Sequence, residues 1–123
     1  TSVKGNMTTG ENMAKDTMMA KAGSYIPYDS AKLAMAKTGN VVLFFRAAWC
    51  PTCRNVDSDI KSHLSSIPAN LTILDVHYDE AKDLRVKYGV TYQHTFVQVD
   101  ASGVMLKKWS GSPTLAAIVS EVK

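Results

Sequence analysis

The run Val41–Phe45 is the feature of this sequence that most limits its possible folds. It reads VVLFF, and no polar residue alternates with these β-branched, aliphatic and aromatic side chains. A strand of this kind has to be covered on both faces, as a central strand is in a sheet with helices on both sides. The run is also far shorter than the roughly 20 residues that a membrane-spanning helix needs. We therefore expect an α/β fold built around this strand.

The length and composition fit one domain. The chain has 123 residues, of which 46% are hydrophobic and 20% charged, and a chain of this size can bury a continuous core without cross-links. Its 14 basic residues are scattered, and Lys107–Lys108 is their only adjacent pair. Because no basic stripe is present, we expect no nucleic-acid partner. We also expect a monomer without a cofactor.

Residues 1–23 are predicted to be a flexible tail or linker, and residues 24–123 a single domain. The first segment is rich in Gly, Thr, Lys, Asn and Met and has no clean periodicity, apart from one or two helical turns expected near 13–21. Its methionines suggest Cu(I) binding as an alternative, although their spacing is irregular. No signal peptide is visible and the sequence begins without Met. We expect an extracytoplasmic domain cut from a signal or membrane anchor.

The segments after the tail predict helices and strands in alternation, closed by a hairpin. A turn at 101–103, with Gly in it, joins the last two strands, and Ser112 and Pro113 are predicted to begin the last helix. Early crossovers make neighbouring strands parallel, whereas the late hairpin adds antiparallel ones. This predicts a mixed sheet flanked by helices on both faces. The order is helix, strand, helix, strand, helix, strand, strand, helix, with strands near 41–47, 71–78, 94–100 and 104–111.

The two cysteines of the chain, Cys50 and Cys53, lie between the buried strand and the helix that follows it. Pro51 suits the first helical position, so the free amides and the positive end of the helix dipole point at Cys50. Both effects favour the thiolate and can lower a cysteine pKa to about 3.5–7.5. Cys53 lies one turn inward, within reach of a disulfide bond. The pattern predicts an exposed nucleophile and a sheltered resolving thiol, as thiol–disulfide exchange requires, while metal binding stays open as an alternative.

The residues around the cysteines resemble the thioredoxin superfamily. Its pattern is matched by Trp49–Arg54, which reads WCPTCR behind a buried strand, and by KYGV at 87–90, and the likeness runs from about residue 25 to the C-terminus. The resemblance implies a thioredoxin-like fold and a thiol–disulfide oxidoreductase. In such an enzyme Cys50 attacks a disulfide of another protein and Cys53 resolves the mixed disulfide. The reverse transfer to a protein dithiol, and a redox partner protein, are implied as well.

One departure from the family pattern lies in the loop that faces the cysteines. The family usually has a cis-proline before a threonine there, and this chain has His94 before Thr95. A cis bond without proline costs about 2.5–4 kcal/mol, so the isomer of the 93–94 bond is left open. The resemblance implies that the backbone of Gln93 pairs with a bound peptide. We accordingly group Trp49, Gln93 and His94 as candidate substrate-binding residues.

His94 has three candidate roles beside the cysteines. Its ring can tune Cys50, by stabilising the thiolate as imidazolium or by carrying a proton. It can complete a site for Cu(I) or Zn(II) with Cys50 and Cys53, which would make the protein a metallochaperone or metal sensor. It can also simply bond to a backbone carbonyl. His77 is the nearest further candidate ligand, whereas His63 is expected at the surface.

Two more departures concern the charges near the cysteines. The family's buried acid, six residues before the first cysteine, is replaced by Phe44, which cannot take a proton. Asp75 on the neighbouring strand is the candidate replacement, expected to be partly buried with a raised pKa. Arg46 replaces an aromatic residue, and its charge either supports the Cys50 thiolate or extends to solvent. We treat Arg46 and Asp75 as candidates for pKa tuning.

The leading interpretation is a thiol–disulfide oxidoreductase without a bound metal. Besides the metal-binding alternative, a non-enzymatic interaction module on the same fold remains open, since a fold alone does not secure an activity.

Overall fold

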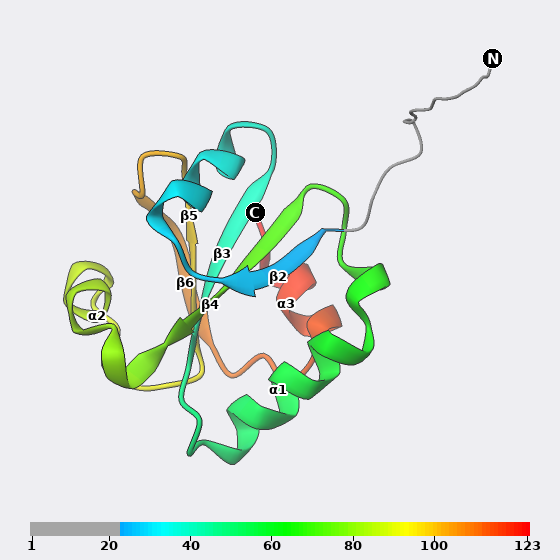
Figure 1. Cartoon of the computed structure of the whole chain (residues 1–123), viewed down its shortest axis with the longest axis vertical. Coiled ribbons are helices and arrows are strands. Elements are labelled where there is room, and N and C mark those ends of the chain that lie inside the picture. Colours follow the sequence, from blue (N-terminus) through cyan, green and yellow to red (C-terminus); the bar gives the residue numbers. More distant parts are fainter. Residues whose placement is uncertain (1–22) are drawn as a thin grey trace.

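The structure, a computed structural model, describes residues 23–123. It is built on a five-stranded sheet in the order β2-β4-β3-β5-β6, in which β2 and β3 run parallel to β4, while β5 is antiparallel to β3 and β6 (Figure 1). The predicted mixed sheet is therefore confirmed. The predictions for the tail and its methionines lie outside the described residues. The strands are β2 (Ser24–Pro27), β3 (Asn40–Arg46), β4 (Leu71–His77), β5 (Thr95–Val99) and β6 (Met105–Ser110).

Helices cover both faces of the sheet. Two of them, α1 and α3, pack on one face, and α2 and the 3-10 helix η1 pack on the other (Figure 1). None of the helices in residues 23–123 is long and apolar enough to cross a membrane. The helices are α1 (Pro51–Ser62), α2 (Lys82–Tyr88) and α3 (Leu115–Glu121), with 3-10 turns η1 (Ser30–Lys37), η2 (Leu64–Ser66) and η3 (Tyr78–Glu80).

Strand β3 is the centre of the core, as its composition predicts. Every residue from Val41 to Phe45 has an exposed fraction of 0%. Alternate side chains enter opposite layers, with Phe44 in the layer beneath α1 and α3, and Phe45 in the layer beneath α2. Because both layers require apolar contacts, the strand shows no polar alternation in its sequence.

The sequence did not predict strand β2. Its four residues, SYIP, pair in parallel with β4 at the edge of the sheet. The segment is short and ends in Pro27, so neither a long apolar run nor a clear alternation marks it. A proline is tolerated there because an edge strand can spare one amide donor.

The predicted start of the last helix was wrong. Helix α3 begins at Leu115, and its N-cap is Thr114, whose hydroxyl accepts a hydrogen bond from the amide of Ala117 at 3.2 Å. Ser112 is engaged elsewhere, because its hydroxyl accepts a hydrogen bond of 2.9 Å from the indole of Trp109. The two residues after Ser112 therefore form a connection instead of the first helical turn.

Aromatic side chains on three strands form a stack beneath the cysteines. Phe44 on β3 stacks on Phe96 on β5 with ring centroids 4.8 Å apart, and Phe96 stacks on Trp109 on β6 at 5.5 Å. These residues also lie opposite one another in the strand register. Such cross-strand pairs fix the register of a sheet as well as filling its core.

Truncation of this stack should be costly. We expect Phe44→Ala to lower the free energy of unfolding by about 3–5 kcal/mol, because it leaves a cavity next to Phe96. Val86→Ala is the control, since Val86 is 74% exposed and should change stability by less than about 0.5 kcal/mol. Urea denaturation measures both values, and equal stabilities for the two variants would contradict the packing described here.

Candidate active site

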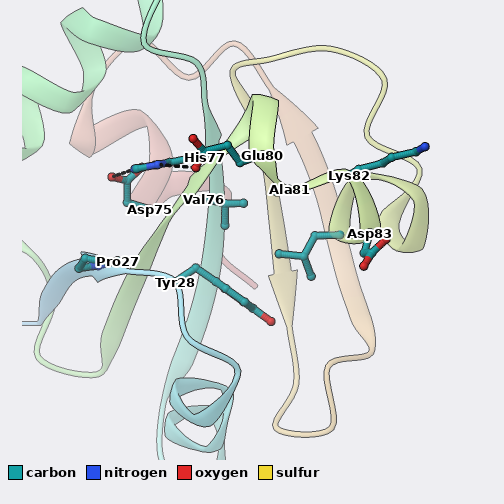
Figure 2. Close-up of a pocket in the computed structure, with 10 residues that line it drawn as sticks. Pro27, Tyr28, Asp75, Val76, His77, Glu80, Ala81, Lys82 and Asp83 are labelled. Carbon is teal, nitrogen blue, oxygen red and sulfur yellow. Dashed lines mark ion pairs between the residues drawn. The ribbon is translucent and has the colours of Figure 1, made fainter.

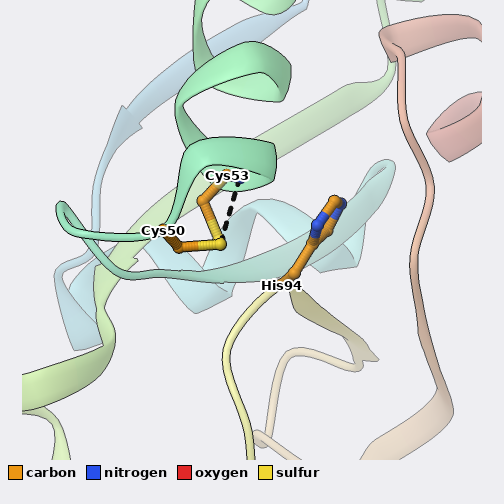
Figure 3. Close-up of side chains that lie close together, drawn as sticks. All are labelled: Cys50, Cys53 and His94. Carbon is orange, nitrogen blue, oxygen red and sulfur yellow. Dashed lines mark hydrogen bonds between the residues drawn. The ribbon is translucent and has the colours of Figure 1, made fainter.

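The backbone places Cys50 at the point where α1 begins. It is the N-cap of the helix, Pro51 takes the first helical position, and the Cys50 sulfur accepts a hydrogen bond from the amide of Cys53 at 3.3 Å (Figure 3). The sulfur thus replaces the side-chain oxygen that usually caps a helix. Since the capping group faces the positive end of the helix, negative charge on this sulfur is favoured.

Both cysteines are buried, so the prediction that Cys50 is exposed was wrong. Cys50 is 2% exposed and Cys53 is 0% exposed. Cys50 belongs to the core layer beneath α1 and α3, and the hydroxyl of Thr52 lies 3.2 Å from its sulfur. His94 lies on the other side of that hydroxyl.

The environment moves the pKa values of the two thiols in opposite directions. Burial alone would raise the pKa of Cys50, but hydrogen bonds from Cys53, Thr52 and Gln93 outweigh it and hold that pKa below its ordinary value. Burial, aided by the hydrogen bond with Cys50, raises the pKa of Cys53 to about 12. Cys50 is therefore the thiol that ionises first, and Cys53 retains its proton.

His94 has an unusual backbone conformation. Its φ angle is 62°, and within residues 23–123 it is the one non-glycine residue with a positive φ. Its amide donates to the carbonyl of Phe45 at 2.9 Å, and its carbonyl accepts from the amide of Gly111 at 3.2 Å. These bonds join the loop to the end of β3 and to the segment after β6. Histidine tolerates this left-handed region better than most residues.

The ring of His94 is held at both nitrogens. Nε2 lies 2.8 Å from the carbonyl oxygen of Ser112, and Nδ1 lies 3.0 Å from the hydroxyl oxygen of Thr52. A carbonyl can only accept, so Nε2 carries the hydrogen, and in the neutral ring Nδ1 is left to accept from Thr52. A continuous line of hydrogen bonds therefore runs from Cys50 through Thr52 to His94.

Thr52 is the member of this line that the sequence analysis missed. Its position between the two cysteines was visible, but the direction of its hydroxyl depends on the turn at the start of α1. Only two observations taken together could have indicated this contact. Thr52 lies two residues after Cys50, and His94 was expected to face the cysteines, so a hydrogen bond between the two side chains could have been inferred.

Arg46 and Asp75 are brought together with each other. The guanidinium of Arg46 donates two hydrogen bonds to the Asp75 carboxylate, at 2.9 and 2.7 Å. This pairing raises the pKa of Arg46. Asp57 on α1 lies 3.9 Å from the same guanidinium and accepts a hydrogen bond from Tyr25 at 2.7 Å. The charge of Arg46 is thus paired with carboxylates. The sequence analysis expected it either to support the Cys50 thiolate or to extend to solvent, and the structure shows neither arrangement.

The candidate substrate-binding residues lie around the cysteines. Trp49 is 55% exposed, and its indole donates to the carboxylate of Asp79 at 2.8 Å. Gln93 is half-buried and contributes one of the hydrogen bonds that lower the pKa of Cys50. Tyr92, which precedes Gln93 in the chain, is also 55% exposed.

A separate surface pocket lies at the carboxyl end of β4 and contains neither cysteine (Figure 2). Asp75 and His77 line it together with Tyr28, Glu80 and Lys82. His77 is 61% exposed and lies between Asp75 and Glu80, at 3.7 and 3.6 Å. His77 is thus engaged with carboxylates, and it is not among the residues whose ligand atoms gather at the cysteines.

Loss of the Thr52 hydroxyl should weaken the ionisation of Cys50. We expect Thr52→Val to raise the pKa of Cys50. Once Nδ1 of His94 carries a proton, the Thr52 hydroxyl is free to donate to the Cys50 thiolate, and the valine removes that hydrogen bond while nearly keeping the side-chain volume. Thr52→Ser retains the hydroxyl and should stay near the wild type. Ultraviolet absorbance of the thiolate, followed against pH, measures both values, and an unchanged pKa in Thr52→Val would contradict this role.

Replacement of His94 by the family's proline should destabilise this loop. A proline ring holds φ near −65°, and it has no amide hydrogen for the carbonyl of Phe45. We therefore expect His94→Pro to lower the free energy of unfolding by at least about 1 kcal/mol. His94→Asn, which tolerates a positive φ and keeps the amide, is the control. Chemical denaturation compares the variants, and a more stable His94→Pro protein would contradict the expectation.

Comparisons with known proteins agree with this architecture. The family model described as Thioredoxin matches residues 28–123. A thioredoxin-like protein of Fusarium culmorum is 29% identical over 103 residues, which are 76% of this chain and 84% of the relative. Thioredoxin-1 of Drosophila melanogaster is 32% identical over 57 residues, 46% of this chain and 53% of the relative.

Solved structures show the same fold. The chain resembles Trxlp of Edwardsiella tarda with a TM-score of 0.62 and 24% identity, over 78% of this chain and 95% of that one. It resembles Fasciola hepatica thioredoxin with a TM-score of 0.53 and 30% identity, over 62% and 71%. Together with the family match, these likenesses confirm the predicted thioredoxin-like fold. The chain belongs to the thioredoxin family.

Proposed function

We propose that this protein is a thiol–disulfide oxidoreductase that acts on disulfides or dithiols of other proteins through a reversible Cys50–Cys53 disulfide. The observation that carries the proposal is the hydrogen bond of 3.3 Å from the Cys53 amide to the Cys50 sulfur at the start of α1. It brings the second cysteine next to the first and stabilises the first as a thiolate. The thioredoxin relatives support the same class of activity.

In the reductive direction, the Cys50 thiolate attacks one sulfur of a client disulfide. The client S–S bond breaks, its other sulfur leaves as a thiolate and takes up a proton, and a mixed disulfide with Cys50 remains. Cys53 then attacks the Cys50 sulfur, which forms the Cys50–Cys53 bond and breaks the bond between Cys50 and the client. The proton of Cys53 passes through water to the departing client sulfur, which leaves as the second client thiol. Two electrons pass to the client in total, and every step reverses when a client dithiol is oxidised.

The line of hydrogen bonds supplies a base for the first ionisation. When the Cys50 thiol gives its proton to the Thr52 oxygen, Thr52 can pass its own hydrogen to Nδ1 of His94 without any side chain moving. The resulting imidazolium keeps its Nε2 hydrogen on the carbonyl of Ser112. Phe44, which replaces the family's acid, offers no such acceptor. His94 is therefore proposed to act as the proton carrier at Cys50.

A client peptide is proposed to bind across Trp49 and Gln93. The amide and carbonyl of Gln93 make no backbone hydrogen bond to any other residue in 23–123, whereas those of His94 are both engaged within the chain. The free groups of Gln93 can therefore pair with an extended peptide. Trp49 and Tyr92 are each 55% exposed and offer aromatic surface for such a peptide.

The direction and the setting of the reaction form the finer part of the proposal. A lowered Cys50 pKa stabilises the reduced protein and makes the couple more oxidising. We propose a monomeric, extracytoplasmic thioredoxin-like domain that works with a separate redox partner protein. The proposed location rests on the Met- and Thr-bearing composition of the segment before the domain.

Cysteine variants test the proposal. We expect the wild type to catalyse the reduction of insulin by dithiothreitol, and Cys50→Ser to lose this activity because no attacking thiolate remains. Cys53→Ser should instead accumulate a mixed disulfide with the client, which mass spectrometry detects. His63→Ser on the exposed surface is the control. An inactive wild type, combined with partner binding that survives the loss of both cysteines, would favour an interaction module.

A further inference from the structure

We propose that the reduced form of this site also binds Zn(II), with the sulfurs of Cys50 and Cys53 and Nδ1 of His94 as ligands. One ligand atom from each of the three residues can be chosen so that all lie within 4.8 Å of one another. Figure 3 shows the three side chains converging from the start of α1 and from the loop before β5. Two thiolates and an imidazole form a donor set that zinc commonly takes in proteins.

The orientation of the His94 ring is the one that a zinc ligand requires. Histidines that bind metals nearly always donate their other ring N–H to a carbonyl or carboxylate, which fixes the tautomer. Here Nε2 donates to the carbonyl of Ser112 at 2.8 Å, so the lone pair of Nδ1 is on the side of Thr52 and Cys50. The left-handed backbone of His94, bonded to Phe45 and Gly111, holds the ring in this place. The imidazole therefore needs no new tautomer to bind a metal.

Burial and charge favour Zn(II) over Cu(I). With two thiolates and a neutral imidazole, Zn(II) gives a complex without net charge, whereas Cu(I) leaves one negative charge. Cys50 and Cys53 are 2% and 0% exposed, and a net charge in such surroundings carries a desolvation penalty. The same set leaves the fourth zinc position open, as in zinc sites that exchange a ligand.

Zinc and the disulfide exclude each other. Zinc bound to both sulfurs withdraws the thiolate that would attack a client. If a client disulfide oxidises the pair, the Cys50–Cys53 bond forms and two electrons pass to the two client sulfurs, which take up two protons from water. The metal then keeps His94 as its one protein ligand and leaves. Zinc binding would thus hold the protein in its reduced, non-reacting form.

Metal titration of the reduced protein tests this inference. Co(II), used as a spectroscopic substitute, should give thiolate charge-transfer bands at one equivalent, and Zn(II) should displace it. Competition with a chromophoric chelator gives the affinity for Zn(II). We expect His94→Asn to weaken it by at least about tenfold, while His63→Asn, the same change at a histidine with a 55% exposed side chain, should leave it unchanged. Circular dichroism confirms that each variant is folded.

Each result of the titration either supports or overturns the proposed zinc site. One-to-one binding that weakens in His94→Asn and vanishes in the oxidised protein supports the site. No saturable Zn(II) binding, or equal affinity in His94→Asn, overturns it, and a His94-dependent affinity for Cu(I) alone would reassign the metal. Disulfide reduction is measured separately in a chelating buffer, so failure of zinc binding is distinguished from failure of the proposed oxidoreductase activity.

Discussion

The burial of β3 on both faces is the constraint on which the rest of the structure depends. Because its apolar side chains enter two layers, helices have to cover the sheet from both sides, and the chain has to leave the strand at its end and turn directly into α1. This turn carries Cys50. The strand also positions the opposite side of the site, since the carbonyl of Phe45 binds the amide of His94. Strand β3 thus positions both the turn that carries Cys50 and the loop that carries His94.

Beyond this scaffold, small local hydrogen bonds determine the chemistry. The carbonyl of Ser112 decides which nitrogen of His94 carries the hydrogen, and the hydroxyl of Thr52 connects the other nitrogen to Cys50. These contacts also explain why the Ser112 prediction failed, because this residue serves the loop and Trp109 instead of capping α3. A histidine in place of the usual proline therefore changes the site through its ring as well as through its backbone.

Most of the fold could be predicted from the sequence, because apolar patterns reflect burial directly. The run Val41–Phe45 predicted a central strand, and the pattern around Cys50 and Cys53 predicted a helix start with two adjacent thiols. Strand β2 was missed because its stability comes from pairing with β4, which its four residues do not reveal. The contact of Thr52 with Cys50 and the pairing of Arg46 with Asp75 were not predictable either, since both depend on side-chain directions that the sequence does not show.

The mutual neutralisation of Arg46 and Asp75 has a consequence for the surroundings in which this protein can work. Free charges near a thiolate act over several ångströms and are screened by dissolved ions. Here the hydrogen bonds that stabilise the Cys50 thiolate come from the thiol and amide of Cys53, the hydroxyl of Thr52 and the side chain of Gln93. Short hydrogen bonds in a buried site are hardly screened. The nucleophilicity of Cys50 should therefore be nearly independent of ionic strength, from dilute to saline surroundings.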